Sequence, residues 1–335
     1  MRAAVYHGGG RIAVEERPDP VAGPGELVVR VRACGLCGSD LMSWYQDPRA
    51  PLVLGHEPAG EVVQAGLGAP FAEGARVFVH HHVPCMTCAL CRAGRHTLCP
   101  EFRRTHIDPG GLAELVRVPS ENARADVLPL PDGLPEWAAT LIEPLACVIR
   151  GQRWAGVGPG SRVAVVGAGA MGLLEVRAAL AAGAAAVAAV EPRADRRALA
   201  EAAGAAALAA PDPDDLREAL GGPDLADQVF VCTSNREAIA GALHLAGPGG
   251  VVQLFAPTPP GELVGLDLGA IFFREVSIQS TYSAGPFDTR DALALLAAGV
   301  VDASALVSHR LPLDRVEEAF RLARSGEATK VVVEP

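Results

Sequence analysis

Short runs of alternating apolar and polar residues dominate the first third of the chain. The run Leu27–Arg32 is the clearest, with valines interleaved with arginines, and Pro24-Gly25 precedes it as a turn signal. No strong helical pattern separates such runs, so this part of the chain predicts a mostly β domain with loops. The expected strands are Ala3–Tyr6, Ile12–Glu16, Leu27–Arg32, Glu61–Ala65, Arg76–Val79 and Leu112–Val118.

The pattern changes at Arg162. Val163–Val166 is a short continuous apolar run, typical of a buried strand, and similar runs then alternate with helical segments such as Arg236–Leu245. Alternating strands and helices predict a parallel, doubly wound sheet, so the fold class is α/β. The further strands expected are Ala186–Val190, Gln228–Cys232, Val251–Phe255 and Val276–Ser280.

Domain boundaries follow from chain length and from proline. At 335 residues the chain is long for one hydrophobic core, and Pro129, Pro131 and Pro135 mark a stiff connection. A helix is expected over Glu136–Arg150, perturbed at Pro144. We expect a first domain over residues 1–150, a second over 151–283, and a return of 284–335 to the first. That last part is expected to contain the helices Asp288–Ala297 and Leu313–Ala323 and strands at Val307–His309 and Lys330–Glu334.

Composition changes this picture little. Hydrophobic residues make up 50% of the chain, but alanine inflates that figure and aromatic residues are only 4%, as in a soluble globular protein. The net charge of −10 and the absence of a Lys/Arg block argue against nucleic acid as a partner. The longest apolar run, Ala178–Val190, is mostly alanine and too short to span a membrane. No signal peptide precedes the first strand, so a cytoplasmic protein is expected, with its thiols reduced.

A candidate catalytic metal site lies in Cys37-Gly38-Ser39-Asp40 and Gly55-His56-Glu57. A thiol, an imidazole and a carboxylate suit a borderline-soft divalent ion with an open coordination position, so the motif favours catalytic zinc. Gly55 permits a tight turn before the two potential ligands. Taken alone, a cysteine here would be a buried small residue, and Cys34 with Cys37 could form a redox pair. The combination of motifs favours the metal.

The most specific local signal is the spacing of Cys85, Cys88, Cys91 and Cys99. Four thiolates this close can close a tetrahedral shell, which leaves no room for substrate and therefore indicates structural zinc. Cys99-Pro100 also resembles an iron–sulfur run, but that run has three residues before its last cysteine where this loop has seven. Two zinc ions per chain are expected.

Other polar residues near these motifs are expected to lie outside the site. His80-His81-His82 would end a strand and point alternately to its two faces. His106 and Asp108 are expected on a surface loop that could border the pocket.

A dinucleotide fingerprint follows the strand Val163–Val166. Gly167-Ala168-Gly169-Ala170-Met171-Gly172 opens a helix, and its glycines would let the backbone approach a pyrophosphate at the helix N-terminus. Glu191, at the end of the next strand, would accept hydrogen bonds from ribose hydroxyls, which favours NAD. Arginines close to that acid would instead accommodate NADP. These are Arg193, Arg196 and Arg197; further candidate cofactor contacts at strand ends are Thr233, Leu254–Ala256, which includes Phe255, and Thr281.

Glu143-Pro144-Leu145 carries a further candidate, because a carboxylate beside a helix kink can reach across a domain cleft; the alternative is an ordinary exposed glutamate. In their order and separations, all these motifs together resemble the zinc-dependent medium-chain alcohol dehydrogenases, over essentially the whole chain. Glu57 and Glu143 resemble the polyol branch, with its sorbitol, threonine and glucose dehydrogenases. The resemblance implies a GroES-like domain and a Rossmann domain with catalysis in the cleft between them, in a homodimer or homotetramer.

The resemblance also implies roles for single residues. Cys37, His56 and Glu57 would hold zinc, Glu143 would be a further ligand or bind the water on the metal, and Asp40 would orient His56. Zinc lowers the pKa of a hydroxyl, and Ser39 would pass the proton outward. The implied reaction oxidises a secondary alcohol (a polyol, sugar, cyclitol or amino alcohol) to a ketone by hydride transfer to NAD.

Two positions depart from the branch. Met42 stands where a histidine often follows the Asp40 motif, so Met42, Trp44 and Tyr45 would shape a different pocket. Arg150 stands where a histidine often follows Glu-Pro-Leu, and it could meet an anionic or hydroxylated group of the substrate. Two alternatives stay open: an NADP-preferring alcohol or aldehyde oxidoreductase, and a zinc- and dinucleotide-binding protein without catalysis.

Overall fold

The computed structural model describes residues 1–335, which divide into two compact units. The first unit joins Met1–Ala146 to Ala284–Pro335 and is therefore discontinuous in sequence. The second unit is Cys147–Ser283, so the boundary falls a few residues before the expected residue 150.

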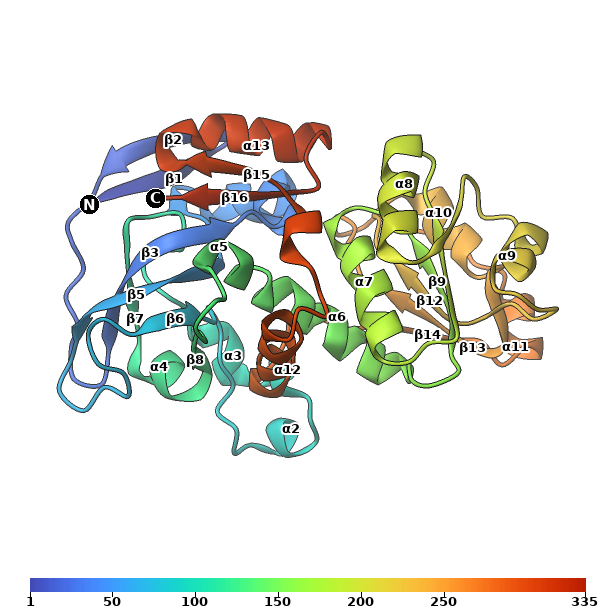
Figure 1. Ribbon diagram of the computed structural model, residues 1–335, viewed down its shortest axis with the longest axis horizontal. Helices are drawn as coiled ribbons and strands as arrows, with labels where there is room; N and C mark the ends of the chain where they lie inside the picture. Colours follow the sequence, from blue (N-terminus) through green and yellow to red (C-terminus); the bar gives the residue numbers. More distant parts are fainter. The chain divides into compact units, whose positions relative to one another are not determined.

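The core of the first unit is a seven-stranded sheet in the order β15-β16-β3-β5-β6-β8, with β7 also paired to β3. β16 runs antiparallel to β3 and places Val332 opposite Gly35, so the end of the chain lies beside its beginning (Figure 1). Along β3, Val29 and Val31 are buried while Arg30 and Arg32 are exposed, as the alternating pattern predicts. The strands are β3 (Leu27–Gly35), β5 (Glu57–Ala65), β6 (Arg76–Val79), β7 (Leu115–Val118), β8 (Val127–Pro129), β15 (Val307–Pro312) and β16 (Lys330–Glu334).

A smaller three-stranded sheet, ordered β2-β1-β4, completes the β-structure of this unit. Its strands are β1 (Arg2–Gly8), β2 (Arg11–Glu16) and β4 (Leu52–Val53). The amphipathic helix α13 (Val316–Ser325) buries Val316, Ala319 and Phe320 and packs against β2 and β16.

Short helices also interrupt the strands, and all except Leu313–Arg315, which begins the expected helix Leu313–Ala323, lie where the sequence predicted none. Most have only one or two turns, which is too short for a helical period to show. They are η1 (Gly38–Leu41), α1 (Ser43–Gln46), η2 (Asp47–Arg49), α2 (Ala89–Arg92), η3 (His96–Leu98), α3 (Pro100–Arg104), α4 (Ser120–Asp126), η4 (Ala303–Ala305) and η5 (Leu313–Arg315). The longer α12 (Pro286–Ala297) packs against α4 and α5.

The helix expected over Glu136–Arg150 is two helices instead. α5 (Glu136–Ala139) ends before Thr140, and α6 (Ile142–Ala155) begins two residues later. Pro144 therefore lies in the first turn of α6, where a backbone N–H would have no partner within the helix. The proline follows a break between helices and does not kink a continuous one.

The second unit is the predicted doubly wound sheet. Six parallel strands lie in the order β11-β10-β9-β12-β13-β14, and the order reverses between β9 and β12. The strands are β9 (Arg162–Val166), β10 (Ala186–Val190), β11 (Ala206–Leu208), β12 (Ala226–Val231), β13 (Ala246–Leu254) and β14 (Ser277–Ser280). The helices are α7 (Ala170–Ala181), α8 (Ala194–Ala203), α9 (Pro213–Ala219), α10 (Arg236–Ala242) and α11 (Leu268–Phe273).

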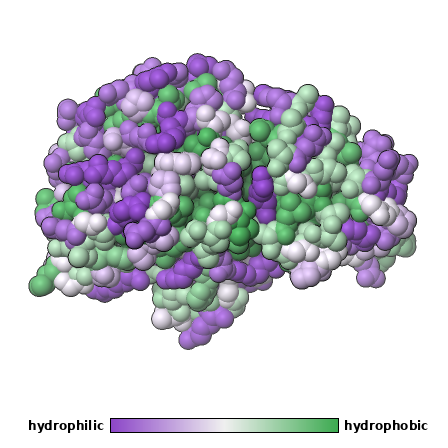
Figure 2. All heavy atoms as spheres, in the orientation of Figure 1, coloured by the Kyte–Doolittle hydropathy of each residue, from purple (hydrophilic) through white to green (hydrophobic).

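Small residues allow helix α7 to lie close to this sheet. α7 packs against β9 and β10 and buries Ala178 and Ala179. A Cβ atom at Gly172 would lie only 1.8 Å from the carbonyl oxygen of Gly167. Pale green atoms gather where the alanine-rich α7 and α8 reach the surface (Figure 2). None of the helices combines the length and the apolar character that crossing a membrane requires.

Candidate metal centres and dinucleotide site

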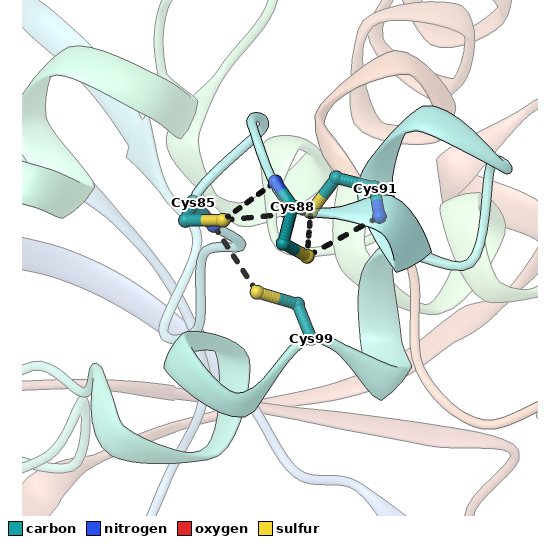
Figure 3. Close-up of side chains that lie close together, drawn as sticks. All are labelled: Cys85, Cys88, Cys91 and Cys99. Carbon is teal, nitrogen blue, oxygen red and sulfur yellow. Dashed lines mark hydrogen bonds between the residues drawn. The ribbon is translucent and has the colours of Figure 1, made fainter.

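The four spaced cysteines converge on one point of the first unit, with their sulfur atoms facing one another (Figure 3). Cys88 Sγ lies 3.5 Å and Cys85 Sγ 3.9 Å from Cys91 Sγ. Zn–S bonds of about 2.3 Å in a tetrahedron place neighbouring sulfurs roughly 3.8 Å apart. The donor set and its spacing therefore fit a structural zinc ion.

The surroundings of these thiols differ. Hydrogen bonds from the Thr87 hydroxyl and from backbone N–H groups lower the pKa of Cys85 to about 6, so this thiol is largely ionised at neutral pH. Burial and the neighbouring sulfurs raise the pKa of Cys91 to about 12. A cation at the centre would favour the thiolate form of every member.

Cys37, His56 and Glu57 also come together, with one potential ligand atom from each within 4.8 Å of the others. Cys37 precedes η1, and Glu57 begins β5 opposite Gly35 of β3. A Cβ atom at Gly35 would lie 1.9 Å from Glu57 Oε2, so glycine leaves the space for this carboxylate. Gly55 has φ of +90°, the left-handed conformation that the turn before His56 requires. The thiol, imidazole and carboxylate fit a zinc ion with one open position.

Asp40 is buried beside this trio. It accepts a hydrogen bond from the Cys37 N–H at 3.0 Å, and its other oxygen lies 3.4 Å from His56 Nδ1. Burial opposes charge on both side chains, but their mutual attraction outweighs it, so the pKa of His56 is raised and that of Asp40 is lowered. Asp40 therefore orients the His56 ring through Nδ1, on the side away from Nε2.

Sequence reasoning missed Lys330, which pairs with Glu57. The Lys330 ammonium lies 2.7 Å from Oε1 and 2.6 Å from Oε2 of Glu57, and both side chains are buried. Burial alone would lower the pKa of Lys330, but the Glu57 carboxylate more than offsets it, so the ammonium stays protonated. Burial and nearby Glu143 raise the pKa of Glu57, while Lys330 opposes them. The sequence feature that could have indicated this pair is a lysine at the start of a strand, Lys330–Glu334, whose middle residues are all valine.

Glu143 lies close enough to Glu57 to raise its pKa, but its carboxylate is not one of the three ligand atoms of the trio. Its carboxylate lies within 4.8 Å of potential ligand atoms of His80 and His81, the two histidines that the sequence analysis left outside the site. β6 ends at Val79, so the histidines follow the strand and do not alternate across it. The ring centroids of His80 and His81 are 5.3 Å apart.

The other sequence candidates of this unit lie around η1 and in surface loops. Ser39 is partly exposed within η1, and Met42 separates η1 from α1. Tyr45 carries the Arg49 guanidinium 3.8 Å above its ring and lies next to Trp44. His106 is exposed, and Asp108 forms an ion pair with Arg117 at 3.0 Å.

Cys34 does not form a redox pair with Cys37. It is fully buried in the apolar core, and burial raises the pKa of its thiol. A buried thiol of this kind is unreactive, so Cys34 has a packing role.

In the second unit, the glycine motif connects β9 to α7, whose first residues are Ala170 and Met171. Gly167 has φ of +97°, and Gly169 precedes the helix. Glu191 follows β10 and accepts hydrogen bonds from the N–H groups of Ala168 at 2.9 Å and Arg193 at 3.0 Å. The acid is therefore fixed against the glycine loop, at the carboxyl edge where the strand order reverses.

The nearby arginines already have protein partners. Arg193 pairs with Asp195 at 2.6 Å, and Arg197 donates to the backbone carbonyls of Glu191 and Pro192. The Arg196 guanidinium lies 4.0 Å from the position of a Cβ at Gly169, so it extends over the glycine loop.

The three candidates at strand ends lie where predicted. Phe255 and Thr281 directly follow β13 and β14, and Thr233 lies two residues after β12. Thr233 lies beside Gly167, and Thr281 accepts a hydrogen bond from Gln253 at 3.1 Å. The Phe255 ring lies 2.9 Å from the position of a Cβ at Gly151, so part of its surface packs against α6.

Arg150 lies on α6, where its guanidinium is 5.6 Å from the centre of the Trp154 ring. The side chain is buried. Nothing in its packing within the second unit assigns it a substrate group.

Comparison with known proteins connects both units to one family. Residues 23–132 match the alcohol dehydrogenase GroES-like domain, and residues 170–298 match the zinc-binding dehydrogenase domain. Sorbitol dehydrogenase of Gallus gallus is 32% identical, covering 99% of this chain and 95% of its own. L-threonine 3-dehydrogenase of a Chelativorans species is 30% identical, covering 96% of this chain and 94% of its own.

A solved structure agrees. A zinc-binding dehydrogenase from Sinorhizobium meliloti, bound to NADP, superposes with a TM-score of 0.88 at 34% identity and covers 100% of this chain and 99% of its own. The chain is therefore an oxidoreductase that belongs to the zinc-dependent medium-chain alcohol dehydrogenases, in the branch of the sorbitol and threonine dehydrogenases.

Proposed function

We propose that this enzyme oxidises a secondary alcohol, in a polyol, sugar, cyclitol or amino alcohol, to a ketone, and that it uses NAD in preference to NADP. The observation that carries the proposal is the convergence of Cys37, His56 and Glu57, with Asp40 set behind His56. This is a three-ligand set of mixed donors, which leaves a position for substrate, unlike the four-sulfur set.

In the proposed mechanism, zinc supplies Lewis acidity that lowers the pKa of the substrate hydroxyl. Cys37, His56 and Glu57 would hold the ion. Asp40 keeps the His56 ring in place, because its carboxylate is itself anchored by the Cys37 N–H. Lys330 balances the charge of Glu57, which limits the net negative charge around the ion.

Ser39 is proposed to take the hydroxyl proton and pass it to solvent. Ser39 follows Cys37 by two residues and is partly exposed, so its hydroxyl can lie between the metal ligand Cys37 and bulk water. Because residue 42 is a methionine, it offers no imidazole that could continue the path. We expect water to complete it.

The preference for NAD rests on Glu191. Its carboxylate is held against the glycine loop, where it would accept hydrogen bonds from ribose hydroxyls and repel a 2′-phosphate. The ion pair of Arg193 with Asp195 reduces the positive charge that it could offer to a phosphate. Arg196, which extends over the glycine loop, is the residue that favours NADP instead. The structure of the Sinorhizobium relative contains bound NADP, so NADP is the specific alternative.

The experiment that tests the function is a reduction screen with NAD and, separately, NADP across sugars, polyols, amino alcohols and simple secondary alcohols. We expect turnover with NAD and at least one hydroxylated substrate, and its loss in Cys37→Ala. Full activity of Cys37→Ala on any substrate would refute the metal mechanism. Higher kcat/KM with NADP would refute the cofactor preference, and no turnover with either would favour a binding protein without catalysis.

Arg150 is proposed to meet an anionic or hydroxylated group of the substrate. An unchanged KM for every substrate in Arg150→Ala would exclude this role.

We further propose a homodimer or homotetramer that forms through the outer edge of the second sheet. β14 is an edge strand, and α11 leaves Phe272 76% and Phe273 86% exposed beside Leu268. Apolar side chains this exposed indicate a protein contact, and an unpaired strand edge can extend across a two-fold axis.

The absence of disulfide bonds among the eight cysteines supports a cytoplasmic location.

Light scattering of wild type and Phe273→Glu tests the assembly. We expect a dimer or tetramer for the wild type and a smaller species for the variant; a monomeric wild type would refute the proposal.

A further inference from the structure

A second set of potential metal ligands lies in the first unit and shares no residue with Cys37, His56 and Glu57. One nitrogen of His80, one nitrogen of His81 and a carboxylate oxygen of Glu143 lie within 4.8 Å of one another. The His56 and His81 rings, with centroids 4.9 Å apart, place this set beside the first one. The two sets are neighbours with different donors.

His80 is held in the way that proteins hold a metal-binding histidine. Its Nδ1 lies 2.7 Å from Asp126 Oδ2, and both side chains are completely buried. The other Asp126 oxygen accepts a hydrogen bond from the Thr289 hydroxyl at 2.6 Å. Since the carboxylate accepts, Nδ1 carries the hydrogen and Nε2 keeps its lone pair. A carboxylate behind the ring is the usual support of a histidine ligand.

Two buried histidine nitrogens of this set have no hydrogen-bond partner. His80 Nε2 is buried and has no hydrogen-bond partner, and the same is true of His81 Nδ1. Leaving a buried polar atom without a hydrogen-bond partner is unfavourable, so two such atoms on neighbouring histidines indicate that a ligand binds there.

We propose that His80, His81 and Glu143 form a second divalent-cation site beside the Cys37 site. Two imidazoles and one carboxylate suit zinc, cobalt and other first-row transition ions. Ligand atoms of a bound zinc ion lie roughly 3.4 Å apart, so side chains whose ligand atoms start within 4.8 Å of one another must close inward by at most about 1.4 Å. That movement and the lack of sulfur make the site weaker than the four-cysteine site.

Occupation of this site has a consequence for catalysis. A cation bound there holds Glu143, which then cannot act at the neighbouring zinc, so excess zinc would inhibit the enzyme reversibly. This consequence rests on the role at the zinc that the family resemblance implies for Glu143, whereas the cation site itself does not.

Equilibrium dialysis with Co²⁺ tests the site on protein that carries its two zinc ions. We expect wild type to retain about one further equivalent of cobalt, with visible d–d absorption but without the near-ultraviolet band that a thiolate ligand gives. His81→Ala and Glu143→Gln should bind at least tenfold less of this cobalt at the same free concentration.

His82→Ala is the matched control. His82 is the adjacent histidine of the same run, but its Nδ1 contacts the Thr105 carbonyl and it is not part of the set. It should retain the further equivalent. His80→Ala is a second test, provided that its circular dichroism shows the native fold without the Asp126 bond.

Three results would overturn the proposal: no further cobalt in wild type, equal binding in His81→Ala and Glu143→Gln, or a thiolate band that shows exchange into a cysteine site. The readout is bound metal, so a protein without dehydrogenase activity could still pass or fail it.

Discussion

The two metal centres of the first unit differ in how far apart their parts lie in sequence. The four-cysteine centre takes every ligand from Cys85–Cys99 and only sulfur donors. The Cys37 centre mixes three donor types and depends on Lys330, a partner 273 residues from Glu57. A closed set of like donors stabilises a loop, whereas an open, mixed set needs neighbours that control charge and orientation. We therefore expect the four-cysteine centre to serve stability and the Cys37 centre to serve catalysis.

The largest expected effect separates these two roles directly. Cys37→Ala should lower kcat/KM at least about a thousandfold, because it removes several kcal/mol of transition-state stabilisation by the metal. Cys88→Ala should instead lower the melting temperature, with much of the activity retained by the molecules that stay folded. Steady-state kinetics and thermal unfolding measure both. Loss of turnover in Cys88→Ala without a change in stability would show that the two centres do not divide these roles.

The Lys330–Glu57 pair should show a large effect on folding. Lys330→Met leaves a buried carboxylate without its counter-charge, which costs about 3–5 kcal/mol of unfolding free energy in zinc-free protein. Added zinc should recover part of this loss, since the ion supplies positive charge near Glu57. Urea unfolding with and without zinc is the measurement, and Lys330→Arg is the control that keeps the charge. Equal loss in both variants would assign the effect to packing.

Asp40→Asn should have a smaller effect, and it tests whether the Cys37 centre, unlike the four-cysteine centre, depends on a carboxylate outside its ligand set. The amide keeps the size but loses the charge that orients His56, so zinc should bind the Cys37 centre roughly 10–100-fold more weakly. Competition with a chelator measures this, and the four-cysteine centre serves as an internal reference in the same molecule. If both centres weaken together, the effect is not local to Asp40.

The smallest effect concerns Glu175, a buried carboxylate of the second unit with no ammonium or metal set beside it. Burial raises its pKa well above 4.5, although Gln152 donates a hydrogen bond at 2.7 Å. The folded state therefore holds a proton that the unfolded state has lost above pH 4.5, so stability falls as pH rises from that value.

Glu175→Gln should remove this pH dependence. We expect the variant to be more stable than wild type by about 1 kcal/mol at pH 8, with the gain vanishing below pH 4.5. Thermal unfolding across this range measures it. A constant difference at all pH values would show that Glu175 does not titrate there.

Much of the fold could be predicted from local patterns. The strand Val163–Val166, the glycines after it and Glu191 each lie within a short stretch of the chain, and they form the predicted βαβ unit. The break before α6 could not be predicted, because Pro144 is compatible with a kink and with a first turn. The short helices of the first unit also gave no periodic signal.

The sequence by itself indicated the candidate metal ligands and the dinucleotide loop, because each motif is a short stretch of chain with distinctive residue types and spacing. Tertiary structure alone decided that Lys330 balances Glu57, that Asp126 and Thr289 support His80, and that Glu143 lies with the histidines. These contacts depend on the pairing of β16 with β3 and on helix packing. Local sequence cannot encode them, since residues hundreds of positions apart become neighbours only through the order and register of the strands.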